Sequence, residues 1–163
     1  MKRWNLGVGA VLVSLALNGA QAAEIHDGHS HAAAVDGRTV LALAPDERAM
    51  ILEEMRMFLA GVQKMTAALG RPDMPAVAEA ARDMGQRMVH EVPPALRTKL
   101  PLEFRQLGFS VHRDFDQIAL DAENMKDVSY SLNQLSGALQ KCVSCHATYQ
   151  IRSPALDGLH DKD

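Results

Sequence analysis

The chain has 163 residues, of which 47% are hydrophobic, 23% are charged and only 4% are aromatic. Its formal net charge is −3, and an acidic chain of this kind is a poor partner for nucleic acid or for anionic lipid. It has two cysteines, so a framework of structural disulfides is not expected, and its length suits one domain with a single hydrophobic core.

The first 22 residues are typical of a secretory signal peptide. Lys2 and Arg3 form a basic start, residues 6–17 form an apolar core, and residues 20–22 offer a small-residue cleavage site, so we expect cleavage after Ala22. An uncleaved membrane anchor is the alternative, but this apolar run is shorter than the roughly 20 residues that a spanning helix needs. We therefore predict a periplasmic protein with no membrane span after cleavage.

Residues 23–44 are polar, contain several Ala and Gly and have no sustained periodicity, which predicts a mostly disordered linker. Three histidines, His26, His29 and His31, lie in this linker. Histidine-rich tracts can bind copper or zinc, although a solvated tail is the simpler interpretation.

From residue 45 onward the spacing of apolar residues predicts four helices, at about 45–69, 74–92, 102–125 and 128–153. Helix starts and stops are indicated by prolines, glycines and acidic residues at the expected ends. Apolar residues at alternating spacings of four and three define an inner face for each helix: Ile51, Met55, Phe58, Val62, Met65 and Leu69; Val77, Ala81, Met84 and Met88; Phe104, Gly108, Val111, Phe115, Ile118, Ala122 and Met125; and Val128, Leu132, Leu135, Leu139, Cys142, His146 and Tyr149.

No segment alternates persistently in the manner of a β-strand, so we predict none. The expected fold class is all-α, an antiparallel four-helix bundle over residues 45–152, followed by a polar tail over residues 153–163.

The fourth predicted helix carries Cys142-Val143-Ser144-Cys145-His146, a pattern typical of c-type haem attachment. On a helix, Cys142, Cys145 and His146 fall within an arc of roughly 100°, so one porphyrin can reach all three. The two cysteines would form thioethers with one covalently attached haem c, and His146 would ligate its iron.

Two other interpretations of the motif need partners that the chain lacks. A structural zinc site requires four ligands, and there is no third cysteine. A thioredoxin-like redox pair belongs in a βαβ pattern, which the helical periodicity does not support. Haem attachment is therefore the preferred interpretation.

At this motif the chain resembles the cytochrome c′ family, whose members are exported four-helix bundles with one haem attached through Cys-x-x-Cys-His near the end of the last helix. The resemblance covers residues 45–152, and it includes Tyr149, three residues after the motif. It implies that His146 is the fifth iron ligand and that the first helix covers the opposite face of the haem.

In low-spin relatives a methionine of the first helix fills the sixth iron position, which makes Met55 the candidate here. In an antiparallel bundle Met55 lies level with His146, whereas Met65 lies two to three turns deeper, and Met50 and Met57 face away from the core. The alternatives are that Met55 is only core filler, or that His112 of the third helix is the ligand.

Haem propionates need cationic partners, and Arg56 and Arg152 are the candidates. At two positions where the family often has a basic residue, this chain has none: Gln150 occupies the position after Tyr149, and Ile51 and Leu52 lie one turn before Met55.

Two functions follow from these expectations. The leading one is a periplasmic electron carrier that cycles between Fe(II) and Fe(III) with His/Met ligation and meets redox partner proteins through small, transient contacts. The alternative is a five-coordinate protein whose open iron position binds nitric oxide or carbon monoxide. We expect no enzymatic activity, because apart from His112 no distal acid or base is evident. The family resemblance also implies a homodimer through outer helix faces, and Gly61 would permit close helix contact there.

Overall fold

The computed structural model describes residues 36–154, with the exception of the side chains at positions 90 and 91. Eight elements follow one another along this part of the chain: β1 (Thr39–Ala42), α1 (Pro45–Leu69), α2 (Met74–Asp83), the 3-10 helix η1 (Gln86–Glu91), α3 (Pro94–Lys99), α4 (Leu102–Asn124), α5 (Val128–Thr148) and β2 (Tyr149–Arg152). The prediction of a mostly helical protein is confirmed.

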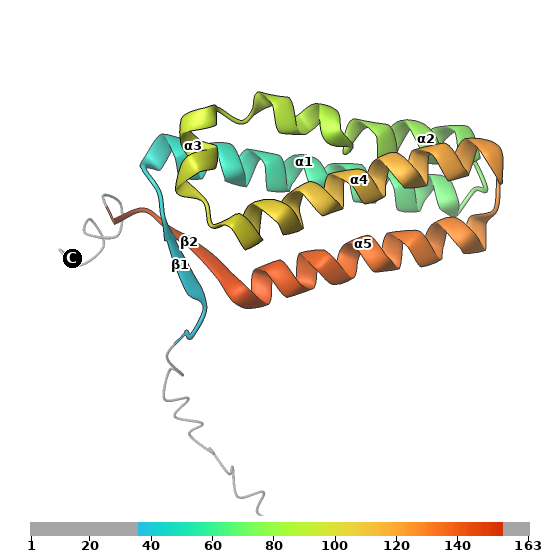
Figure 1. The fold of residues 1–163 in the computed structure, drawn as a ribbon. Coiled ribbons are helices and arrows are strands. Elements are labelled where there is room, and N and C mark those ends of the chain that lie inside the picture. The colour runs from blue at the N-terminus through green and yellow to red at the C-terminus, as the bar shows by residue number, and fades with distance from the viewer. Residues whose placement is uncertain (1–35, 155–163) are drawn as a thin grey trace, which may run out of the picture. The chain divides into compact units, whose positions relative to one another are not determined.

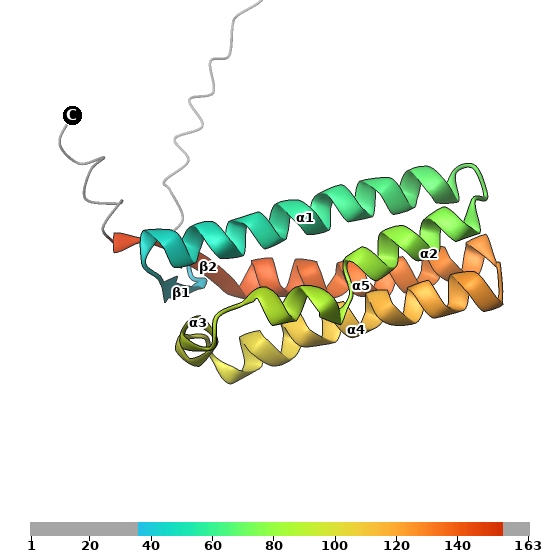
Figure 2. The same cartoon turned by 90° about the horizontal axis from the view of Figure 1, so that it is seen from above.

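The helices pack in an open chain of neighbours. α2 packs on both α1 and α4, and α4 packs on α5, so that these four helices lie alongside one another (Figures 1 and 2). Within residues 36–154, no backbone contact of similar extent joins α1 to α5. Among these four helices, the side between α1 and α5 is therefore the least closely packed.

The first helix has the predicted bounds. Pro45 occupies its first turn with Asp46 and Glu47, whose charges suit the positive end of the helix dipole. The Glu47 carboxylate accepts a hydrogen bond from the Ala44 N–H (3.0 Å) and pairs with Lys99 at the end of α3. Glu47 thereby joins the start of α1 to α3.

The prediction of one continuous second helix to residue 92 is wrong, because the helix breaks between α2 and η1. Two side chains of α4 stabilise the break: His112 binds the Met84 carbonyl (2.9 Å), and Asp116 accepts a hydrogen bond from the Gln86 N–H (3.1 Å). Gly85 is required here, because a Cβ at this position would lie 1.9 Å from Asp116 Oδ1. Tertiary hydrogen bonds thus replace those that a continuous helix would have made.

The absence of strands was also predicted wrongly. β1 and β2 form a two-stranded parallel sheet in which Thr39 pairs with Tyr149 and Leu41 with Ile151. β1 lies within the predicted linker, and β2 takes the place of the last predicted turn of the fourth helix, which ends at Thr148. Each strand has only four residues, too few for alternation to be recognised in the sequence. The predicted connection between helices over residues 93–101 likewise contains α3.

Two hydrophobic clusters hold the structure together. The main core lies between α1, α2, α4 and α5 and includes Met65, Val77, Phe115, Ile118 and Leu135, each at most 3% exposed. The second, which we call the strand-end core, joins β1 to α1 and α3 through five buried residues: Leu41, Leu43, Ile51, Leu96 and Leu100. Phe104, Tyr149 and Ile151 pack against the strand-end core, which therefore lies next to the end of α5.

Several sequence predictions fall outside the described residues, namely the signal peptide with cleavage after Ala22, the metal-binding tract at His26, His29 and His31, and the polar tail beyond Pro154. Among the helices of residues 36–154, none is both long and apolar enough to cross a membrane.

Candidate functional site

The Cys-x-x-Cys-His motif occupies the last two turns of α5. Cys142 and Cys145 are half-buried free thiols, whereas His146 is exposed in the final turn. Ser144 and Thr148 donate hydrogen bonds to the carbonyls of Gln140 and Ser144, so the backbone of the motif keeps a regular helical path. The motif residues are thus positioned on one helix end, beside the point where β2 begins.

A cavity of about 450 Å³ lies beside this helix end, and we call it the motif cavity. Its volume falls in the range of about 300 to 1,000 Å³ that is usual for small-molecule and cofactor sites. Four structural regions supply its lining: Arg38, which immediately precedes β1; Arg48, Ile51, Leu52 and Met55 from α1; Phe104 from α4; and Cys145, His146, Tyr149, Gln150, Ile151 and Arg152 from α5 and β2. Cys142 lies one turn before Cys145 and is not part of this lining.

Met55 and His146 line the same cavity although they are far apart in the sequence. Met55 is half-buried and has Leu52 one turn before it on the same face of α1. The other methionines of α1 lie elsewhere, because Met65 is buried in the main core, and Met50 and Met57 are each 39% exposed and line other pockets. The structure therefore brings together the two residues that were predicted as axial ligands.

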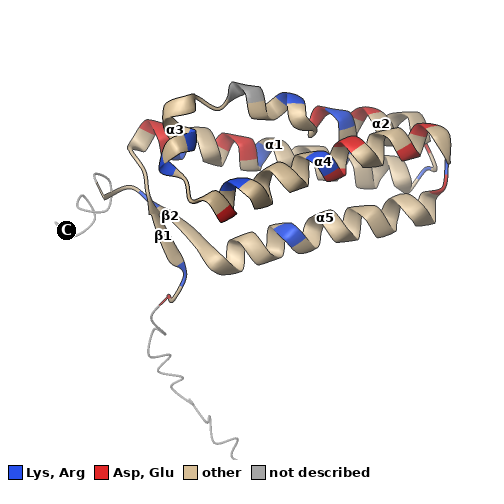
Figure 3. Cartoon of the chain, viewed as in Figure 1, with Lys and Arg blue, Asp and Glu red and all other residues tan. Residues whose placement is uncertain are grey.

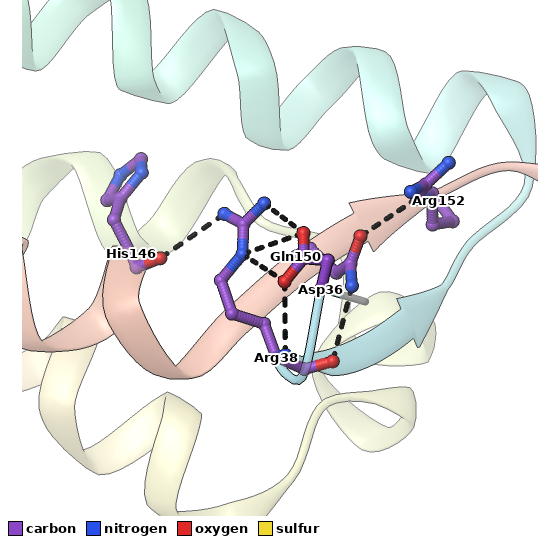
Figure 4. Close-up of polar contacts among 5 residues, drawn as sticks. All are labelled: Asp36, Arg38, His146, Gln150 and Arg152. Atoms are coloured by element: carbon purple, nitrogen blue, oxygen red, sulfur yellow. Dashed lines mark hydrogen bonds and ion pairs between the residues drawn. The ribbon is translucent and has the colours of Figure 1, made fainter. Parts of the chain in front are cut away.

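The β1–β2 pair is anchored to the motif by polar contacts (Figure 4). The Arg38 guanidinium donates to the His146 carbonyl (3.3 Å), which otherwise has no helical partner at the end of α5. Asp36 binds the same guanidinium, and this hydrogen bond lowers the pKa of Asp36 to about 2. Gln150 donates to the Arg38 carbonyl (3.2 Å) and accepts from Arg152 (2.9 Å). Asp36, Arg38, Gln150 and Arg152 are therefore connected by hydrogen bonds, with the link between Arg38 and Gln150 made through the Arg38 backbone, and together they hold the exit of α5.

The basic residues differ in how they relate to the motif cavity. Arg48 and Arg152 line it, as does Arg38. Arg56 is not in the lining, because it is exposed and pairs with Glu53 within the first turns of α1. Tyr149, the first residue of β2, lines the cavity and packs its ring edge-on against Phe104 with 5.3 Å between the ring centroids.

The environment of the two thiols differs from that of a redox-active pair. Burial raises the pKa of Cys142, and burial together with the neighbouring Cys142 raises the pKa of Cys145. Redox Cys-x-x-Cys pairs have a thiol of lowered pKa, commonly at a helix N-terminus. Here the pair lies at the C-terminal end of α5, where the helix dipole disfavours a thiolate. The geometry thus argues against the redox interpretation.

A zinc site receives no support from the surroundings of the motif. Across residues 36–154, no three side chains of His, Cys, Asp or Glu are grouped closely enough to hold a metal ion.

His112 is buried on α4, with 3% of its surface exposed, and lies outside the lining of the motif cavity. Both ring nitrogens face acceptors: Nδ1 the Met84 carbonyl (2.9 Å) and Nε2 the Glu54 carboxylate (3.1 Å). Burial alone lowers the pKa of His112, but the hydrogen bonds to Glu54 and to the Met84 carbonyl outweigh burial and raise it. His112 is therefore engaged in joining α1, α2 and α4.

Three residues near the motif were missed by the sequence analysis, namely Arg38, Arg48 and Gln150. Arg48 could have been found, because it lies seven residues before Met55 and thus on the same helix face. Arg38 and Gln150 could not, because their placement depends on a strand pair that has no clear sequence signal. Gly61 also differs from expectation: it is buried against Met84, the residue that follows α2, and does not lie on an outer helix face.

Comparison of the chain with protein-family models, with curated proteins and with solved structures finds no match.

Proposed function

We propose that the protein is a periplasmic c-type cytochrome that binds one haem through Cys142, Cys145 and His146 and transfers electrons. The observation that carries the proposal is that Cys145, His146 and Met55, from opposite ends of the chain, line a single cavity. The donor set fits the group: two thiols for thioether bonds, one imidazole and one thioether sulfur for the iron.

Each side chain has a defined role in this proposal. Cys142 and Cys145 anchor the haem to α5, His146 supplies the fifth iron ligand, and Met55 supplies the sixth from α1. Haem, when bound, supplies a one-electron Fe(II)/Fe(III) couple, and thioether ligation favours the reduced state. The apolar residues Ile51 and Leu52 limit the access of water to the same cavity.

Arg48 and Arg152 are the proposed partners of the haem propionates, because both line the motif cavity. Arg56, the other candidate from the sequence, is exposed and paired with Glu53, so the proposal assigns it no propionate. Arg38 acts as a positioning residue, because it binds the backbone carbonyl of His146.

The proposed fold is the antiparallel four-helix bundle of the cytochrome c′ type, with α2 and η1 together forming its second helix. The packing of α1 on α2, α2 on α4 and α4 on α5 supports it. The looser side between α1 and α5 is where the motif cavity lies.

Contact with redox partner proteins is proposed at the end of α5. Lys141 is the only Lys, Arg, Asp or Glu residue of this helix, most of which is therefore tan in Figure 3. Val143, inside the motif, is 63% exposed. An exposed apolar side chain within the motif, on a helix with a single charged residue, suits a small, transient contact.

The decisive experiment is spectroscopy of the protein after export in a host with the c-type maturation machinery. We expect covalent haem in the mature chain, a low-spin ferrous spectrum and no rapid carbon monoxide binding. Absence of covalent haem would exclude the cytochrome.

Paired methionine variants test the axial ligand. Met55→Leu keeps the apolar volume and removes the sulfur, so we expect a high-spin ferrous spectrum that responds to carbon monoxide. Met57→Leu is the matched control, because Met57 lies outside the motif cavity, and its spectrum should equal that of the wild type. A low-spin spectrum in Met55→Leu would remove Met55 from the iron.

The second candidate function is the five-coordinate gas-binding protein. It is favoured by the apolar residues Ile51 and Leu52, which line the motif cavity beside Met55 and could cover an open iron position. Rapid carbon monoxide binding by the wild-type ferrous protein would select this function over electron transfer.

A further inference from the structure

A second cavity, separate from the motif residues, lies between α1, η1, α3 and α4. Its volume is about 340 Å³, and we call it the His112 cavity. Its apolar walls include Ile51, Val89, Val92, Leu100, Phe104 and Phe109. It does not include Cys145, His146 or Met55, although Ile51 and Phe104 contribute to both cavities. An apolar cavity of this size with few polar groups has the general character of a small-molecule site.

Arg97, Arg105 and Gln106 are exposed residues that also line the His112 cavity, whereas its two other polar residues, His112 and Glu54, form a buried pair. The side chain of His112 is 4% exposed and that of Glu54 is 16% exposed, and the two are joined between Nε2 and Oε1 (3.1 Å). The other His112 nitrogen is used by the Met84 carbonyl, so both ring nitrogens have partners. Glu54 Oε2 has no hydrogen bond to any described residue, and a carboxylate oxygen accepts hydrogen bonds. The pair thus offers a ligand one acceptor and no donor.

An independent observation is the glycine in the wall. Gly108 lies in the interior of α4 and lines the cavity, and a Cβ placed there would meet no atom within 4 Å. Glycine in a helix interior costs about 1 kcal/mol relative to alanine. Gly61 and Gly85 are each explained by a side chain packed against the backbone, Met84 and Asp116 respectively. No neighbouring residue explains Gly108 or Gly137, and of these two only Gly108 lines the His112 cavity. Its effect is to leave open a part of the His112 cavity that any other side chain would fill.

We propose that the His112 cavity binds a small phenol, which packs its ring beside Gly108 and donates its hydroxyl hydrogen bond to Glu54. The aromatic and aliphatic walls suit the ring, and the unpaired carboxylate oxygen suits a hydroxyl donor. The proposal does not depend on haem attachment, because none of the cavity's residues belongs to the motif.

Calorimetric titration of the purified, exported protein with 4-ethylphenol tests the proposal, with ethylbenzene as the ligand that lacks only the hydroxyl. We expect saturable one-to-one binding of 4-ethylphenol with a Kd of about 1 mM or tighter, and binding of ethylbenzene at least about tenfold weaker. No saturable binding of 4-ethylphenol would overturn the proposal. Equal affinities for the two ligands would overturn the hydrogen bond to Glu54.

Glycine variants locate the site. Gly108→Leu places a side chain in the cavity and should weaken 4-ethylphenol binding at least about tenfold, while Gly108→Ala should weaken it less. Gly137→Leu is the matched control, because Gly137 also lies in a helix with open space around it but is on α5. Thermal unfolding verifies that each variant is folded. Undiminished binding in folded Gly108→Leu, or equal loss in Gly137→Leu, would contradict the location.

The variant Glu54→Gln tests the acceptor. It keeps the side-chain volume and removes the charge, so the preference for 4-ethylphenol over ethylbenzene should fall at least about threefold. An unchanged preference would contradict the role of Glu54. Haem absorption, measured on the same samples, reports separately on the proposed cytochrome function.

Discussion

The two sides of α1 are built differently. Toward α2 the helices pack closely: Gly61 lies against Met84, and the buried residues of α2 include the small side chains of Ala78, Ala80 and Ala81. Toward α5 there is no comparable packing within the described part of the chain, and Leu59, for example, is 71% exposed. On the side toward α2, which we call the closed side, small residues allow the helices to pack closely. On the side toward α5, which we call the open side, longer side chains line the motif cavity.

The comparison shows that the residues of α1 that stabilise the fold and the residues that line the candidate site lie on different sides of the helix. The closed side belongs to the main core, whereas Met55, Leu52 and Arg48 line the motif cavity. Changes on the closed side should therefore alter the free energy of unfolding. Changes on the open side should have little effect on unfolding and, in the proposed cytochrome, should alter the ligation of the iron.

The largest effect is expected from leucine substitutions on α5. Leu135 is 3% exposed in the main core, whereas Leu132 is 46% exposed. Leu135→Ala should lower the free energy of unfolding by about 2 to 5 kcal/mol, because it leaves a cavity, and Leu132→Ala by less than about 1 kcal/mol. Urea unfolding of both variants measures the difference. Similar losses would show that the side of α5 bearing Leu132 is closed in solution.

A smaller effect is expected at the α1–α2 contact. A Cβ at position 61 would lie 2.3 Å from Met84 Sδ, so Gly61→Val should destabilise the protein by about 1 to 3 kcal/mol. Gly137→Val is the control, because Gly137 has open space around it, and its effect should stay within about 0.5 kcal/mol. Adding Met84→Ala to Gly61→Val should cost less than the sum of the two single losses. Full additivity would contradict the contact.

The next effect is the pH dependence that His112 introduces on the closed side. The pKa of His112 is raised above 6.5, so its stabilising contribution is fully present below about pH 6.5 and is lost as the pH rises through the raised value. Urea midpoints should therefore fall as the pH rises above about 6.5, and His112→Gln should flatten this decline. An unchanged slope in His112→Gln would assign the decline to other groups.

The smallest effect is expected at Arg56 on the exposed surface of α1. The Arg56 and Glu53 side chains are 62% and 59% exposed, so Arg56→Ala should change the unfolding free energy by less than about 0.5 kcal/mol.

In the proposed cytochrome, Arg48→Ala should perturb the haem absorption spectrum and Arg56→Ala should not. The reverse result would restore Arg56 as the propionate partner.

Sequence patterns predicted the parts of the fold that depend on local signals. The bounds of α1 follow from Pro45 and Gly70, and the start of α4 follows from Pro101. The break after α2 was not predictable, because it depends on hydrogen bonds from His112 and Asp116 of α4. The pairing of β1 with β2 was not predictable either, because each strand has only four residues and its partner lies far away in the sequence.

The candidate site was predictable to a similar extent. His146 was selected from the Cys-x-x-Cys-His motif. Met55 was selected among the methionines of the first helix by helix periodicity and level. The structure brings both to the motif cavity, while their ligation of iron stays a prediction. Arg56 was chosen because it follows Met55, but adjacent residues on a helix differ by about 100° in direction. Arg48, seven residues before Met55, has the required direction.

The parallel pairing of β1 with β2 also has a consequence for the order of folding. The hydrogen bond from Gln150 to Arg38 spans 112 positions, so β1 cannot find its partner until nearly the whole chain is available. Contacts of such sequence separation form late, after local helix pairs such as α1 and α2. We therefore expect the end of α5 that carries the motif to be fixed last, and to stay accessible during folding for longer than the rest of the four helices.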